Sequence, residues 1–111
     1  MIVRNAKQSE VTRFDGGEYR GCSMRRLITE DDGAPTFSMR VFTLDPLGFT
    51  PFHAHEHEHE VYILAGSGSM RTDTDTITVR PGDSILLGPF DHHQFTAGDA
   101  GLEFICCVPH H

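Results

Sequence analysis

Short runs of β-branched and aromatic residues recur along the chain, and glycine, proline and aspartate interrupt them. Runs spaced about 8 to 12 residues apart are typical of β-sandwiches and barrels. The sequence gives about nine or ten such strands, including weaker signals before Gly21, and no convincing helical pattern. It therefore predicts an all-β protein, with a barrel favoured because closure removes exposed strand edges. The clearest expected strands are 23–29, 36–44, 61–65, 69–72, 77–80, 84–87, 93–96 and 102–108.

The expected turns follow from local turn formers. Residues 45–48, Asp-Pro-Leu-Gly, should reverse the chain, so that the segment after them enters as a new strand. Residues 66–68, Gly-Ser-Gly, should close the strand before them, and residues 73–76 should form the turn of a hairpin. Residues 97–101 are expected to form a loop before the last strand.

The 111 residues fit one compact domain that can build a core without disulfides. No apolar run approaches the ~20 residues that span a bilayer, and no signal peptide is recognisable, so we expect a cytoplasmic protein. The three cysteines are Cys22 and the adjacent Cys106 and Cys107. Their odd number and the strain of a bridge between neighbours indicate reduced thiols, with Cys106 and Cys107 packing in one strand.

The charge balance bears on possible partners. Sixteen acidic residues against nine basic ones give a net charge of -7, and the basic residues are scattered apart from Arg25-Arg26. Such a surface repels nucleic acid and anionic membranes. We therefore expect neither as a partner.

Histidines are concentrated in the segment His53-Ala54-His55-Glu56-His57-Glu58-His59-Glu60, which holds four of the eight in the chain. In an extended backbone the odd positions face one way and the glutamates the other. Neutral imidazole is the commonest metal ligand, so this row predicts a metal site. An exposed polar turn is the alternative that the segment leaves open by itself.

A second pair of histidines, His92 and His93, lies about a strand and a half beyond the turn at residues 81–83. In an antiparallel barrel, strands far apart in sequence face each other across the lumen. One of these two side chains could therefore complete the cluster.

These residues resemble the two motifs of the cupin family. In the first, Gly48 is followed by His53, His55, His59 and Gly66, with His59 at the position where most cupins have glutamate. In the second, Gly82 is followed by Pro89 and, eleven positions after the glycine, His93. The motifs cover residues 48–95, and a looser match covers 34–109. The chain departs from the pattern at three points. Histidine replaces the glutamate, the spacing from Gly48 to His53 is one residue shorter than usual, and Asp91 lies near the position where the second motif usually has glycine.

The exchange of glutamate for histidine resembles a subgroup of small single-domain cupins with four-histidine manganese sites. This resemblance implies a jelly-roll barrel, or double-stranded β-helix, over residues 34–109. Residues 1–33 would form N-terminal strands or an arm at a homodimer interface. It also implies one divalent transition metal per chain, manganese first and iron, nickel, copper or zinc as alternatives, held by His53, His55, His59 and His93.

Glu60 is an alternative fourth ligand, because it satisfies the looser form of the motif. Strand alternation separates the two choices: an inward His59 places Val61 and Ile63 inside, whereas an inward Glu60 places Tyr62 and Leu64 there. We favour His59. His57 and His92 are expected not to be ligands, His57 lying at the tip of the connection, and His110 and His111 are expected to form a solvated tail.

The lumen should be apolar, with Phe104 and Cys106 nearest the metal as substrate-binding residues and Phe95 two positions after His93. No protein-derived acid or base stands out there. The leading hypothesis is a metal-dependent oxygenase or dioxygenase acting on a small organic substrate. The alternatives are a non-redox isomerase, lyase or cyclase, and a ligand- or metal-binding protein without catalysis.

Overall fold

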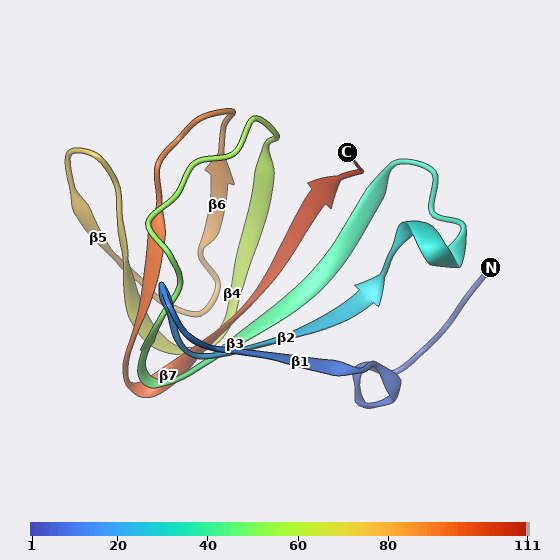
Figure 1. Ribbon diagram of the computed structural model, residues 1–111, viewed down its shortest axis with the longest axis horizontal. Helices are drawn as coiled ribbons and strands as arrows, with labels where there is room; N and C mark the ends of the chain where they lie inside the picture. Colours follow the sequence, from blue (N-terminus) through green and yellow to red (C-terminus); the bar gives the residue numbers. More distant parts are fainter. Residues whose placement is uncertain (111) are drawn as a thin grey trace.

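The computed structural model describes residues 1–110, and these form an all-β fold, which confirms the predicted class (Figure 1). The only helical pieces in this part of the chain are two short 3-10 turns, Ala6–Gln8 and Glu30–Asp32. No helix in residues 1–110 is long and apolar enough to cross a membrane. The strands are β1 (Val11–Gly16), β2 (Tyr19–Ile28), β3 (Phe37–Phe49), β4 (His59–Arg71), β5 (Thr76–Val79), β6 (Ser84–Leu87) and β7 (Gln94–Pro109).

The described residues contain seven strands, so the expectation of nine or ten was wrong. The expected turn at residues 45–48 lies inside β3, the expected strand end at 66–68 lies inside β4, and the expected loop at 97–101 lies inside β7. Each of these stretches bends one continuous strand, because the pairing register shifts there by a bulge or irregularity. Glycine therefore marks bends in long strands as well as turns between short ones.

Gly66 illustrates why the bend needs glycine. Its φ of +88° lies in the left-handed region. A Cβ atom there would also overlap the carbonyl oxygen of Gly101 on β7. The two strands can therefore approach this closely only because β4 carries a glycine at this position.

The bends turn a single antiparallel sheet into two facing layers. The strand order is β1-β2-β3-β7-β4-β5, and β6 pairs with the first half of β4. In one layer, the second half of β7 lies between β3 and the first half of β4; in the other, its first half pairs with the second half of β4. The result is a jelly-roll barrel, in which the long strands sweep from one layer to the other (Figure 1).

The core fills the space between the layers, and β4 shows how alternation builds it. Val61 and Ile63 are buried, whereas Tyr62 and Leu64 face solvent. This confirms the inward face predicted from an inward His59. The core cluster comprises Cys22, Leu44, Val61, Ile63, Met70, Val79, Leu87, Phe95, Ala97, Leu102, Phe104 and Cys106.

The N-terminal residues continue the sheet. β1 pairs with β2, and β2 pairs with β3 from Arg20 to Ile28, so these strands extend the barrel layer at its edge. The chain before β1 is held by Arg4, which donates to the Asp32 carboxylate at 2.9 and 3.1 Å and to the Leu27 carbonyl oxygen. The homodimer interface expected at residues 1–33 stays a prediction.

Candidate metal site

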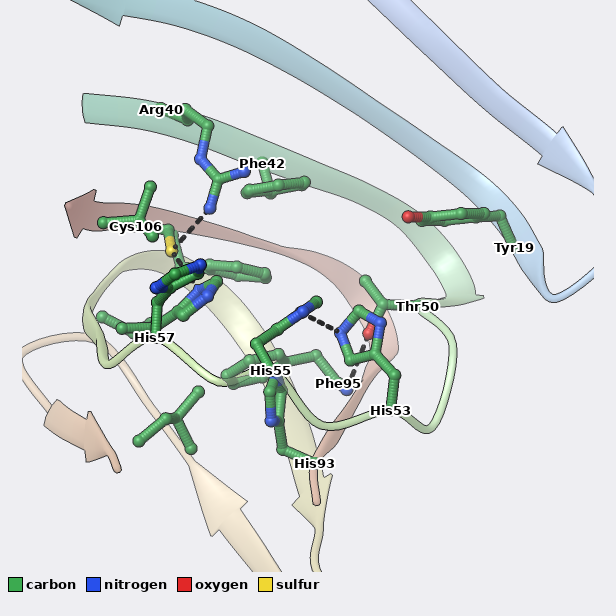
Figure 2. A pocket seen from close by; sticks show the side chains of 15 residues that line it. Tyr19, Arg40, Phe42, Thr50, His53, His55, His57, His93, Phe95 and Cys106 are labelled. Atoms are coloured by element: carbon green, nitrogen blue, oxygen red, sulfur yellow. Dashed lines mark hydrogen bonds between the residues drawn. The ribbon is translucent and has the colours of Figure 1, made fainter. Parts of the chain in front are cut away.

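A cavity of about 180 Å³ opens between the two layers, and most of the predicted site residues line it (Figure 2). Its wall combines imidazoles, apolar side chains and a few other polar groups. The lining residues are Tyr19, Arg40, Phe42, Thr50, His53, His55, His57, His59, Val61, Leu87, His93, Phe95, Phe104, Cys106 and Val108.

The histidines reach this cavity from two distant parts of the chain. His53 and His55 lie in the connection between β3 and β4, His59 is the first residue of β4, and His93 directly precedes β7. His53 and His93 form an isolated antiparallel bridge, with N–H to carbonyl distances of 3.1 and 2.9 Å in the two directions. The expectation that residues after 48 enter as a new strand was wrong, because strand β4 begins only at His59.

Three imidazoles converge closely enough to share an ion. One ring nitrogen from each of His53, His55 and His93 lies within 4.8 Å of the others. The His53 and His55 Nε2 atoms are 3.2 Å apart, and the ring centroids of His53 and His93 are separated by 4.8 Å. This arrangement brings three of the four predicted ligands together.

The ring of His93 is oriented by a backbone carbonyl two residues earlier in the chain. Its Nδ1–H donates to the Asp91 carbonyl oxygen at 2.8 Å, and a carbonyl can only accept. In the neutral ring, Nε2 therefore carries the lone pair. Metal-binding histidines are commonly held this way, because the second nitrogen fixes the tautomer and the ring orientation.

The cluster favours neutral imidazole. Burial is the main cause that lowers the pKa of His53 to about 4 and the pKa of His59 to about 3, and the neighbouring histidines contribute to both shifts. Burial also lowers the pKa of His93. These side chains are therefore deprotonated at neutral pH, which is the state that binds metal.

His59 lies beside the three-residue cluster. It is nearly buried, and its ring stacks on that of His55 with centroids 4.7 Å apart. Its Nδ1 lies 3.3 Å from Cys106 Sγ, which holds the ring against β7. Glu60, the alternative ligand, is exposed on the outer face of β4, so its carboxylate does not line the cavity.

The remaining histidines occupy varied positions. His57 is half-buried and lines the cavity, with Nε2 3.5 Å from the Glu56 carboxylate. His92 points away from His93, is exposed, and stacks on Phe52 while its Nδ1 lies 3.1 Å from Asp73. The expectation of a solvated tail was wrong for His110, whose ring nitrogens contact Ser38 Oγ and the Ala34 carbonyl oxygen. His111 lies outside the described residues.

Phe104 and Cys106, the predicted substrate-binding residues, are both buried and both line the cavity. Phe104 lies between Phe95 and Phe42, with ring centroids at 4.5 and 5.4 Å. Burial raises the pKa of the Cys106 thiol, so it is neutral at physiological pH. Besides the imidazoles, the cavity wall therefore contains a row of aromatic rings and a thiol.

Sequence analysis missed three polar side chains in the cavity wall, Arg40, Tyr19 and Thr50. A signal for Arg40 existed: it is in phase with Phe42 and Leu44 on β3, and Leu44 is one of the most buried residues of the core. A charged residue on an inward-facing strand position is unusual enough to suggest a site. Tyr19 had no comparable signal, because the pattern before Gly21 is weak.

The donor set fits a divalent transition metal. Three neutral imidazoles from two separate segments are a common ligand group for zinc, copper, iron and nickel. Three ligands also leave coordination positions for a fourth side chain, water or substrate, as in catalytic sites. The geometry does not select one of these metals.

Comparison with known proteins places these features in a wider group. The sequence profile of a family described as a cupin domain matches residues 40–108. The structure is similar to that of the polyketide cyclase RemF from Streptomyces resistomycificus, with a TM-score of 0.91 and 29% identity over 98% of this chain and 79% of that one.

Two further solved structures share the fold. A cupin-2 domain from Rhodospirillum rubrum has a TM-score of 0.87 and 24% identity, covering 100% of this chain and 75% of that one. A predicted oxalate decarboxylase from Thermotoga maritima has a TM-score of 0.83 and 24% identity, with 98% of each chain covered. No curated protein matches the sequence.

Proposed function

Because the chain belongs to the cupin family, we propose that it is a metal-dependent enzyme acting on a small organic substrate in the barrel cavity. The observation that carries this proposal is the convergence of His53, His55 and His93 at a cavity whose wall is made mostly of apolar side chains and a few further polar ones. Such a combination of a few convergent polar groups and an apolar lining is typical of small-molecule sites.

His53, His55 and His93 would hold the ion, and His59, whose ring stacks on His55, is the proposed fourth ligand. Manganese is the first choice, with iron, nickel, copper and zinc as alternatives. Because all four donors are neutral, the ion would keep its full charge, which favours the binding of anionic oxygen ligands. When bound, it would supply Lewis-acid chemistry and, if redox-active, oxygen chemistry.

A non-redox cyclase or isomerase activity is the reaction class that the comparisons favour. The polyketide cyclase RemF shares 29% identity with this chain across nearly its whole length. The aromatic row of Phe42, Phe104 and Phe95 suits a flat, conjugated substrate and excludes water from it. The protein would then hold a substrate with several ketone groups in a folded conformation, and a bound ion would supply the Lewis acid for the ketone oxygens.

An oxygenase or dioxygenase activity is the second candidate. The support for it is that four imidazoles on an ion that prefers six ligands would leave two positions, so that substrate and dioxygen could bind together. The cavity is also lined by the apolar rings of Phe42, Phe95 and Phe104, which would shield reactive species from water.

One experiment tests the metal and separates the two activities. Protein purified without added metal is analysed for metal content, then stripped by a chelator and reloaded with each candidate ion. The loaded protein is incubated with a linear triketone, with and without dioxygen. Cyclisation with loss of one water in both conditions supports the cyclase, whereas product formation with dioxygen uptake supports the oxygenase. Failure to bind any of these ions would overturn the proposal.

A further inference from the structure

Arg40 is a cation in the cavity wall that the metal site does not use. It lies on β3, and it lines both the metal cavity and a neighbouring cavity of about 310 Å³. Val108 also belongs to both walls, so the two cavities adjoin at this point. Figure 2 shows Arg40 reaching toward Cys106, while His53, His55 and His93 gather together lower in the view.

The guanidinium has few acceptors. One terminal nitrogen donates to Cys106 Sγ at 3.2 Å, and the guanidinium carbon lies 5.2 Å from the centre of the Phe42 ring. The buried Nε has no hydrogen-bond partner, a state shared by only one other side-chain atom in residues 1–110. A guanidinium carries five N–H donors, and a neutral thiol is a weak acceptor. A buried donor without a partner is costly, so this position calls for an acceptor.

No carboxylate of the described residues forms an ion pair with Arg40. Glu30 and Asp31 line the neighbouring cavity, but both are exposed and neither bridges to it. Its cross-strand neighbour on β2 is Arg26, a second cation on the same face of the sheet. Like charges in register are unfavourable, and an anion between β2 and the cavity would offset this cost.

The surroundings define the shape of that anion. Cys106 Sγ contacts both Arg40 and His59 Nδ1, at 3.2 and 3.3 Å. A single sulfur atom therefore links the guanidinium to the imidazole of His59. Phe42 lies between Arg40 and Phe104, and its ring is stacked on the latter at 5.4 Å. A flat molecule along these rings would reach the histidines with one end and Arg40 with the other.

We propose that Arg40 binds the oxyanion of a planar, conjugated substrate, either a carboxylate or an enolate, whose body packs along Phe42 and Phe104. The forked N–H donors match two oxygens or one delocalised oxyanion. The inference rests on the proposed function only in taking this cavity as the substrate site. Arg40 would thereby select anionic over neutral substrates.

The test measures binding by calorimetry with benzoate as the carboxylate probe, acetylacetonate as the enolate probe and benzamide as the neutral one. Wild-type protein is compared with Arg40→Gln, Arg40→Lys and the control Arg80→Gln, which removes an exposed cation outside both cavities. Each protein is used with manganese loaded and again after chelation. We expect Arg40→Gln to weaken anion binding at least about tenfold, the scale of one charged hydrogen bond, with benzamide and Arg80→Gln unaffected.

Loss of benzoate binding alone would identify a carboxylate, and loss of acetylacetonate binding alone an enolate. Equal anion affinities in wild type and Arg40→Gln, or no anion binding by wild type, would overturn the inference. If Arg40→Gln does not fold, Arg40→Lys decides. Weaker anion binding by Arg40→Lys than by wild type supports the inference, and unchanged anion binding refutes the forked geometry on which it depends. Failure to retain manganese would count against the proposed function alone, because the chelated protein still tests Arg40.

Discussion

Neighbouring positions that point into the barrel and out of it give identical residue types different chemistry. His93 is buried in the cluster with Nδ1–H fixed on the Asp91 carbonyl, whereas the adjacent His92 is exposed beside Asp73. Cys106 lies in the cavity wall, whereas Cys107 is half-buried on the other side of β7. The direction in which a strand points a side chain therefore decides whether it takes part in the site.

The largest effect expected from this difference is on metal binding. Removing an inner ligand should cost more than the 10- to 100-fold typical of an outer-shell partner, so His93→Ala should weaken metal affinity by well over about 100-fold. His92→Ala should leave it unchanged, because that ring faces Phe52 and Asp73. Competitive titration against a metal-binding dye measures both. Equal losses in the two variants would contradict the assignment.

Stability should show the same contrast along β4. Ile63 is 0% exposed and Leu64 is 38% exposed. Ile63→Ala should lower the free energy of unfolding by about 2–5 kcal/mol, because it leaves a cavity in the core. Leu64→Ala should cost no more than about 0.5 kcal/mol, as for other surface positions. Urea denaturation measures both, and similar losses would show that the two faces do not differ as described.

The pH dependence of the metal-free protein should report the inner histidines. Their pKa values are lowered in the folded state, to about 4 for His53 and about 3 for His59, while an unfolded histidine titrates near about 6.5. Below pH ~6.5 the unfolded chain therefore binds more protons than the folded protein, so the free energy of unfolding should fall with falling pH. This loss should level off once the pH is below the pKa values of the folded protein.

The control for the pH profile again compares the two faces. Denaturation midpoints between pH ~7 and ~4 should fall less steeply in His53→Ala than in wild type, because one buried group no longer contributes. His92→Ala should keep the wild-type slope. A wild-type midpoint that stays constant over this range would contradict burial of neutral imidazoles.

The smallest effect concerns the two cysteines. Cys106→Ala removes the sulfur that contacts His59 Nδ1, so the ring of His59 would be less well oriented. Metal affinity should fall by about tenfold, the lower end of the range typical for loss of a residue that orients a metal ligand. Cys107→Ala should have no measurable effect, since its side chain does not line the cavity. The same dye titration applies. An unchanged affinity in Cys106→Ala would show that His59 does not depend on the thiol.

Part of the site could be predicted from the sequence through strand alternation. Once His59 is taken as the inward residue, alternation places Val61 and Ile63 inside, as the structure has them. The strand boundaries were predicted less well: the glycines at 66 and 101 mark bends, and sequence signals for a bend and a turn are the same. The position of His110 was missed because its partners, Ser38 and Ala34, lie far away in sequence.

The sequence by itself determined the all-β class and the alternation of inner and outer faces along the strands, since these depend on local periodicity and residue type. The histidines expected at a common cavity followed from the resemblance to the cupin motifs. Only the tertiary structure decided that His53, His55 and His93 meet while His59 contacts Cys106, and that Arg40 lies in the cavity wall without a carboxylate partner. These relations depend on the pairing of β7 with both β3 and β4, which joins residues between 23 and 72 positions apart, from Arg71–Gln94 to Phe37–Pro109. The long-range register of paired strands, which no local pattern specifies, determines them.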